Sequence, residues 1–257
     1  MGNVNNIISL SGGKDSTAML LLMLEKNIPI HSAVFFDTGW EFPQMHDHLD
    51  KLEKYTGVGL IRLRPEKTFN YWMFERRVVA RKGEKRGTVH RIGNGWPSPM
   101  RRWCTRQKVS ALEAYTKDFE KPVQCIGYAA DEAHRAEAKT LNKKKHWKFR
   151  FPLIELGVDE REALSLCKSH GFDWGGLYDH FRRVSCFCCP LQRLNDLRIL
   201  RNEFPDQWSQ MLEWDASVPG HNRGFRDYAT VHDLDAKFAY EESLTKFNEK
   251  SAAAVGE

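Results

Sequence analysis

Long hydrophobic runs are missing from this 257-residue chain, and their absence excludes membrane-spanning proteins. No apolar stretch approaches the roughly 20 residues that cross a bilayer as a helix. The first residues also lack the basic start and the apolar stretch of a secretory signal. We therefore expect a cytoplasmic protein with no membrane partner.

Cysteine is sparse and unevenly spaced, with six in the whole chain. Because the cytosol keeps thiols reduced, we do not expect a disulfide framework. Cys186, Cys188 and Cys189 are bunched, which favours metal or redox chemistry. No cysteine follows Cys189, so any thiol chemistry must use residues up to that position.

Acidic residues are nearly missing from one segment. Between Arg76 and Lys108, eleven Lys and Arg accompany a single acid, Glu84, although the net charge of the chain is only +5. A second basic run covers residues 139–150. Such runs are typical of surfaces that meet nucleotide phosphates, sulfate or nucleic acid, and a solvated surface is the alternative. Aromatic residues of the first segment could stack on bases: Tyr71, Trp72, Trp96 and Trp103.

Apolar runs alternate with helical patterns along the first half of the chain. Strands are expected at 4–10, 30–36, 58–63 and 123–127, with helices at 15–26, 43–55, 105–117 and 159–170. This order predicts an α/β fold with a doubly wound, parallel, Rossmann-like sheet. We expect a nucleotide-binding domain at 1–190, with a basic insertion at about 65–103 forming a helix and a mobile loop. A helical region at 191–257 would pack on it.

The most informative stretch joins the first strand to the first helix: Ser11, Gly12, Gly13, Lys14, Asp15 and Ser16. The first-turn N–H groups of a helix and its dipole favour anions. Two glycines allow a phosphate to approach the backbone closely, because neither has a Cβ. The hexapeptide resembles the pyrophosphate loop (PP-loop) of ATP pyrophosphatases, which cleave ATP between the α- and β-phosphates.

Two further motifs resemble the phosphoadenosine-phosphosulfate (PAPS) reductase branch of these proteins, within the adenine nucleotide alpha hydrolase-like superfamily. Asp37-Thr38-Gly39, followed by Glu-Phe-Pro, is similar to its second signature, and residues 127–135 are similar to its glycine–acid–arginine segment. The resemblance implies that Asp37, Thr38, Gly127 and Arg135 bind the nucleotide with the loop. It also implies catalytic roles for Lys14, Asp15 and Asp37, with Mg²⁺ positioned by the two aspartates.

The cysteines resemble those of the iron–sulfur members of this branch. Cys104, Cys186 and Cys189 match three of the family's ligand positions, and Cys188 is a candidate for the fourth. A [4Fe–4S] cluster is one interpretation, and zinc is another, with His180 or His90 completing the site. A pair of cysteines without a metal is the third.

The sulfonucleotide reductases of this family use a cysteine in a C-terminal segment as nucleophile, and this chain has none there. We therefore expect an enzyme that binds ATP, adenylates an acceptor with release of pyrophosphate, and transfers sulfur to a nucleic acid or small molecule. A sulfur-donor protein is a further candidate partner. One alternative is a PAPS or adenylyl-sulfate reductase with an atypical nucleophile such as Cys188. Another is a non-catalytic nucleotide- or nucleic-acid-binding accessory protein of a defence system.

Overall fold

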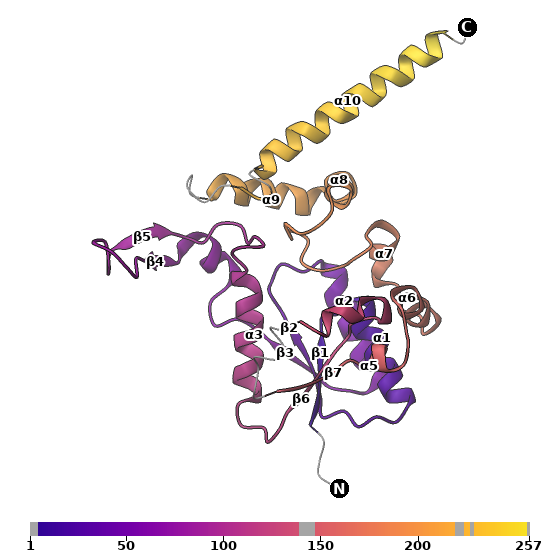
Figure 1. Cartoon of the computed structure of the whole chain (residues 1–257). Helices are drawn as coiled ribbons and strands as arrows, with labels where there is room; N and C mark the ends of the chain where they lie inside the picture. The colour runs from indigo at the N-terminus through magenta and orange to yellow at the C-terminus, as the bar shows by residue number, and fades with distance from the viewer. Residues whose placement is uncertain (1–4, 139–146, 219–223, 227–228, 256–257) are drawn as a thin grey trace. The chain divides into compact units, whose positions relative to one another are not determined.

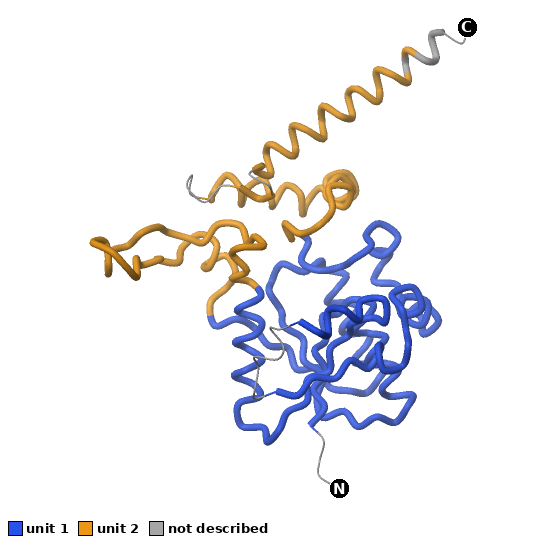
Figure 2. The backbone as a smooth tube through the Cα atoms, in the orientation of Figure 1, with its two compact units in different colours: residues 1–66, 105–187 blue, residues 67–104, 188–257 orange. Residues whose placement is uncertain are grey.

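The computed structural model describes residues 5–138, 147–218, 224–226 and 229–255. Most of the predicted basic run at 139–150 lies outside them. The chain divides into two compact units, which Figure 2 distinguishes by colour. The first unit comprises residues 1–66 and 105–187, and the second comprises residues 67–104 and 188–257. The segment predicted as an insertion thus groups with the C-terminal region.

A five-stranded parallel sheet forms the centre of the first unit (Figure 1), in the order β3-β2-β1-β6-β7. Its strands are β1 (Asn6–Leu10), β2 (Ser32–Phe36), β3 (Leu60–Leu63), β6 (Val123–Ile126) and β7 (Lys148–Arg150). The chain first builds outward from β1 through β2 to β3, and later returns to the other side of β1 with β6 and β7. The prediction of a doubly wound parallel α/β sheet is confirmed.

Helices connect these strands and continue after the last of them. They are α1 (Lys14–Glu25), α2 (Pro43–Thr56), α3 (Trp103–Thr116), η2 (Ala130–Arg135), α5 (Pro152–Glu155), α6 (Glu160–Ser169), η3 (Trp174–Gly176) and α7 (Leu177–His180). Helix α1 is buried on most sides, because it packs on β1 and also against α5 and α6. A helix covered in this way needs the nearly continuous apolar run that the sequence shows at 18–24.

The second unit contains a short hairpin and the C-terminal helices. The π-helix η1 (Tyr71–Glu75) precedes the antiparallel strands β4 (Arg77–Val79) and β5 (Val89–Ile92). The prediction of a mobile loop in this segment is therefore wrong in part, because residues of the segment form a two-stranded antiparallel sheet. The predicted C-terminal helices are α8 (Leu194–Glu203), α9 (Pro205–Ser217) and α10 (Val231–Val255). No helix in the described ranges is both long and apolar enough to cross a membrane.

Trp96 anchors the segment 67–104 to the C-terminal helices within this unit. Its side chain is fully buried, and its indole N–H donates to Asp215 Oδ1 at 2.8 Å. The ring also meets Phe225 edge-on, with 5.0 Å between the ring centroids. Asp215 Oδ2 accepts from the N–H of Val231 at the start of α10. One buried carboxylate therefore joins three parts of the unit.

His48 links α2 to α1 in the core of the first unit. Its Nε2 lies 3.0 Å from Thr17 Oγ1, and its ring stacks on Trp174 with centroids 4.3 Å apart. Burial lowers the pKa of His48 from 6.5 to about 4, and the charge of Lys51 adds to this. The folded protein therefore holds this imidazole neutral at pH values where the unfolded chain protonates it.

This difference predicts that acid weakens the fold well above the pKa of the carboxylates. Between pH 6.5 and 4 the unfolded state binds the extra proton, so the free energy of unfolding should fall by about 2 kcal/mol from pH 7 to pH 5. Urea denaturation at the two pH values measures this loss. His48→Gln should remove that contribution, whereas His134→Gln at an exposed position should retain it. Equal pH dependence in wild type and His48→Gln would show that His48 does not cause it.

Candidate functional site

Three of the predicted motifs lie at one edge of the sheet. The loop Ser11–Ser16 follows β1, Asp37 and Thr38 follow β2, and Gly127 follows β6. These strands are parallel neighbours with β1 in the middle, so their carboxyl ends meet at the point where the strand order reverses (Figure 1). Open α/β sheets bind ligands at such a point.

The N-cap residue of α1 supplies no capping side chain. Gly13 occupies the N-cap position and makes no side-chain hydrogen bond to the helix. The N–H of Lys14 donates to the hydroxyl of Tyr178 at 2.7 Å. The N–H groups of Asp15 and Ser16 donate to no capping side chain among the described residues. The uncapped N–H groups and the helix dipole make this turn suitable for an anion.

Neighbouring segments fix the shape of the loop. Gly12 has a φ of +79°, and a Cβ there would come 2.3 Å from the sulfur of Met45 on α2. The indole N–H of Trp174 donates to the carbonyl of Gly12 at 2.7 Å. Gly12 is thus required both for its left-handed backbone and for its close approach to α2.

Lys14 is buried within an ion-pair group. Its Nζ lies 3.2 Å from Oδ1 of Asp15 and 3.2 Å from Oε2 of Glu160, with 6% of the side chain exposed. Arg182 lies 3.6 Å from the same Glu160 oxygen. A buried ammonium needs such partners, because burying an unpaired charge is costly. Glu160 opens α6, which begins with a capping box formed by Asp159 and Glu162.

The pKa values of Asp15 and Glu160 shift in opposite directions. Burial raises the pKa of Asp15, and Lys14 only partly opposes this. Burial acts in the same direction on Glu160, but the hydrogen bond and the charge of Lys14 bring its pKa below the usual value. Oδ1 of Asp15 is buried and accepts no hydrogen bond from the described residues. Such an oxygen fits a cation ligand, so the predicted role of Asp15 toward Mg²⁺ suits its surroundings.

The second motif forms a tightly bonded turn. Asp37 is buried, and it accepts from the N–H of Gly39 at 2.9 Å and from Arg64 Nε at 3.0 Å. The Glu41 carboxylate accepts from both the N–H and the hydroxyl of Thr38, at 3.0 and 2.7 Å. The backbone N–H of Trp40 donates to the same carboxylate.

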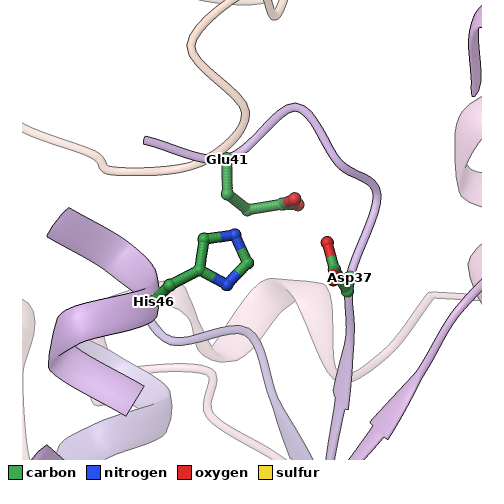
Figure 3. A group of neighbouring side chains, drawn as sticks. All are labelled: Asp37, Glu41 and His46. Atoms are coloured by element: carbon green, nitrogen blue, oxygen red, sulfur yellow. The ribbon is translucent and has the colours of Figure 1, made fainter. Parts of the chain in front are cut away.

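Asp37, Glu41 and His46 form a second candidate cation site. Figure 3 shows the two carboxylates directed toward each other beside the imidazole. One ligand atom from each residue lies within 4.8 Å of the others. Two carboxylates and an imidazole suit a divalent cation. Of these three residues, the sequence analysis assigned a metal-binding role only to Asp37. The spacing Asp-x₃-Glu-x₄-His was the available signal, but it is too common to single out.

Cys186 lies against this second motif. Its backbone forms an isolated bridge with Glu41, and its Sγ lies 3.5 Å from Thr38 Oγ1 and 3.7 Å from Glu41 Oε1. Cys104, Cys188 and Cys189 belong to the second unit, where Cys188 is 1% exposed. A metal centre built from these four cysteines remains a prediction.

Gly127 lies against the first turn of α1, whereas Arg135 is paired with a neighbouring carboxylate. A Cβ on Gly127 would lie 3.0 Å from backbone atoms of Asp15 and Ser16, so this glycine allows β6 to approach the first turn of α1. Arg135 donates to Glu132 at 2.6 and 2.7 Å and lies over the ring of Tyr128 at 4.1 Å. Its role as a phosphate clamp stays a prediction, because Glu132 holds the guanidinium.

Two of the residues predicted to stack on nucleic-acid bases have buried side chains. Trp96 is fully buried and Trp103 is 6% exposed. The indole of Trp103 donates to the carbonyl of Gly95 and meets Phe69 edge-on. The expectation that these two rings stack on nucleic-acid bases is wrong, since both help to form the core of the second unit. Tyr71 and Trp72 are half-buried.

The close approach of Gly127 to α1 predicts a marked effect of one added methyl group. Gly127→Ala would force backbone atoms of Asp15 and Ser16 to move, and overpacking of this kind costs about 1–3 kcal/mol. Gly59→Ala is the matched control, because nothing lies within 4 Å of a Cβ there. Its effect should stay within about 0.5 kcal/mol. Chemical denaturation measures both, and equal stabilities of the two variants would contradict the close contact.

Comparison with known proteins gave relatives that have no assigned function. Two uncharacterized proteins of Methanocaldococcus jannaschii are each 26% identical, over 246 and 212 residues. These cover 89% and 80% of this chain but 43% and 46% of the relatives, so the chain spans less than half of either protein. An uncharacterized 37.8 kDa protein of Escherichia phage 186, encoded in the gpa 5′ region, is 27% identical, covering 85% of this chain and 76% of the relative.

Among solved structures, the phosphate complex of phosphoadenylyl-sulfate (PAPS) reductase from Candida auris matches with a TM-score of 0.45 and 16% identity. The match covers 70% of this chain and 78% of that one. The family model described as the phosphoadenosine phosphosulfate reductase domain matches residues 5–192. That span is well over half of the chain and includes all the motifs described above. The resemblance inferred from the motifs is thus confirmed, and the chain belongs to the phosphoadenosine phosphosulfate reductase domain family.

Proposed function

We propose that this protein binds ATP at the loop Ser11–Ser16 and transfers its adenylyl group to an acceptor, releasing pyrophosphate. Family membership supports a nucleotide-binding PP-loop protein, and the reaction is our inference. The observation that carries it is the uncapped first turn of α1, with Lys14 held beside it and two further motifs at the same sheet edge. An anion at this point would find N–H donors and a nearby ammonium.

Each residue of the loop has a defined task in this reaction. The first-turn N–H groups and the hydroxyls of Ser11 and Ser16 would bind phosphate oxygens, and Gly12 and Gly13 would let the phosphates approach. Thr38, Gly127 and Arg135 would contact the rest of the nucleotide. An acceptor atom attacks the α-phosphorus, and the α–β bridging oxygen leaves with the electron pair as pyrophosphate. Lys14 offsets the charge that develops on this leaving group.

Magnesium would neutralise phosphate charge when bound with the nucleotide. Asp15 offers a buried oxygen that lies 3.2 Å from Lys14 Nζ but accepts no hydrogen bond from the described residues. Asp37 lies in the group with Glu41 and His46. Both residues are therefore proposed to hold the ion. Carboxylates, phosphates and water are the ligands that Mg²⁺ prefers.

Sulfur transfer to the adenylated acceptor is the second part of the proposal. Cys186 lies at the second motif, which places a thiol at the edge of the sheet that carries the loop. Cys104, Cys186 and Cys189 would bind a [4Fe–4S] cluster, with Cys188 as fourth ligand, and zinc is the alternative. The basic segment Arg76–Lys108 suits a nucleic-acid acceptor.

The burial of Cys188 weighs against the reductase alternative that uses it as nucleophile. A thiolate that attacks a substrate needs access and a charge-stabilising environment. Cys188 is 1% exposed, and no cysteine follows Cys189 in the chain. Release of sulfite from PAPS or adenylyl sulfate with a thiol donor would establish that alternative instead.

The adenylation proposal predicts that Lys14 is essential for turnover. Lys14→Ala should lower the rate of pyrophosphate release from ATP, in the presence of acceptor, by at least about 100-fold, because it removes charge stabilisation of the leaving group. Lys26→Ala changes an exposed lysine at the other end of α1 and should leave the rate unchanged. Thermal melting confirms that both variants are folded. Unchanged turnover in a folded Lys14→Ala variant would refute the assignment, and nucleotide binding without turnover on any acceptor would favour an accessory protein.

The cluster proposal predicts a brown protein after anaerobic purification, with about four irons per chain. Cys189→Ser should lose the iron and the visible absorption, because the cluster would lose a thiolate. Cys167→Ser is the control, since Cys167 is buried in the first unit and its thiol lies 3.4 Å from the carbonyl of Lys14. Iron content and absorption spectra of the wild type and both variants measure whether the cluster is bound. A colourless protein containing zinc would support the zinc alternative.

A further inference from the structure

The residues after β5 fold back onto the π-helix η1. The N–H groups of Gly93, Asn94 and Gly95 donate to the carbonyls of Arg76, Trp72 and Met73, at 2.9, 3.0 and 3.0 Å. Gly93 has a φ of +68°, and a Cβ there would come 2.2 Å from the carbonyl oxygen of Met73. The backbone is therefore fixed at this crossing, and Asn94 is held beside Trp72 and Arg76.

Arginine side chains converge on Asn94. Arg76 donates to its side-chain oxygen at 3.4 Å, and Arg101 donates to its backbone carbonyl at 3.3 Å. The guanidinium of Arg76 also lies over the Trp72 ring, 4.6 Å from its centroid. Arg91 stands on β5 opposite Val78. Burial lowers the pKa of Arg91, and the positive charges of Arg101 and Arg76 lower it further.

Carboxylate partners are missing around two of these arginines in the part of the chain that the structure describes. Neither Arg76 nor Arg101 forms an ion pair with a carboxylate there. The contrast with Lys14 is clear, because two carboxylates contact that buried cation. Arginine keeps its proton under all ordinary conditions, so an anion is the kind of ligand that would compensate Arg76 and Arg101.

Two buried donors point to the same kind of ligand. Asn94 is 4% exposed, and its Nδ2 has no hydrogen-bond partner among the described residues. The indole N–H of Trp72 is also buried and without a partner in that part of the chain. Buried polar groups are nearly always paired, and a donor without an acceptor is unfavourable. Both unpaired groups are donors, so the group that would satisfy them is an acceptor.

We propose that Arg76, Arg91, Arg101, Asn94 and Trp72 form a binding site for a phosphate group. A phosphate carries negative charge and several acceptor oxygens, and guanidinium groups bind it in a bidentate manner. The group can be inorganic phosphate or a phosphodiester of single-stranded nucleic acid, which present the same oxygens. The site uses none of the residues assigned to ATP, so it does not depend on the proposed adenylation.

Conservative variants separate binding from folding. Asn94→Asp keeps the shape of the side chain but replaces the unpaired donor with a carboxylate among the arginines. This variant should match or exceed the thermal stability of the wild type and lose the phosphate site. Arg101→Gln should weaken binding about tenfold and reduce the dependence of affinity on salt by about one counterion. Arg81→Gln is the matched control, because it removes the same charge at an exposed position of the same segment.

Two probes identify the source of the phosphate in the full-length protein. A labelled single-stranded oligonucleotide is titrated by fluorescence anisotropy, and inorganic phosphate is titrated by thermal shift at constant ionic strength. Phosphate can also bind the loop Ser11–Ser16, so its effect is taken as the difference between wild type and Asn94→Asp. Oligonucleotide binding that Asn94→Asp abolishes supports a nucleic-acid phosphate. A thermal shift lost in Asn94→Asp, without oligonucleotide binding, supports inorganic phosphate.

The proposal is overturned if Asn94→Asp and Arg101→Gln bind both probes as well as Arg81→Gln does. It is also overturned if the wild type binds neither probe. Lys14→Ala should retain this binding, because Lys14 belongs to the first unit and is not among the five residues of the proposed site. Failure of adenylation and failure of this site are therefore distinguishable.

Discussion

The ion pairs of the buried Lys14 connect the beginnings of two helices, and the geometry of the candidate nucleotide site depends on them. Lys14 is the first residue of α1 and Glu160 is the first residue of α6, so the contact between their side chains brings the two N-termini together. Because a buried ammonium requires a counter-charge, this arrangement constrains where α6 can lie. Tyr178 and Trp174 complete the restraint through hydrogen bonds to Lys14 and Gly12.

The two units differ in how their buried or partly buried cationic side chains are paired with carboxylates. In the first unit, carboxylates compensate Lys14 before any ligand binds, so a nucleotide would be held largely by backbone N–H groups and by a cation beside Asp15. In the second unit, Arg76 and Arg101 contact Asn94 and form no ion pair with a carboxylate of the described residues. The modest net charge of the whole chain conceals this difference, which follows from the scarcity of acids between Arg76 and Lys108.

Local patterns were sufficient to predict the parallel sheet and the loop Ser11–Ser16, because each depends on residues close together in sequence. The partners of the loop could not be predicted in this way. Glu160, Trp174 and Tyr178 lie 146 to 164 positions from the loop residues that they contact, and nothing local marks them. The prediction that Trp96 and Trp103 stack on bases failed for a related reason. The composition of their segment indicated a basic surface, but Trp96 is buried by an aromatic ring and a carboxylate that lie far away in the sequence.

The central claim is that the uncapped start of α1 and its paired lysine form a site for the phosphates of ATP. Calorimetric titration with α,β-methylene ATP and Mg²⁺ tests it directly, because this analogue cannot be cleaved between the α- and β-phosphates and binding is measured without turnover. The account predicts saturable binding of one nucleotide per chain. Absence of saturable binding to a folded protein would contradict it.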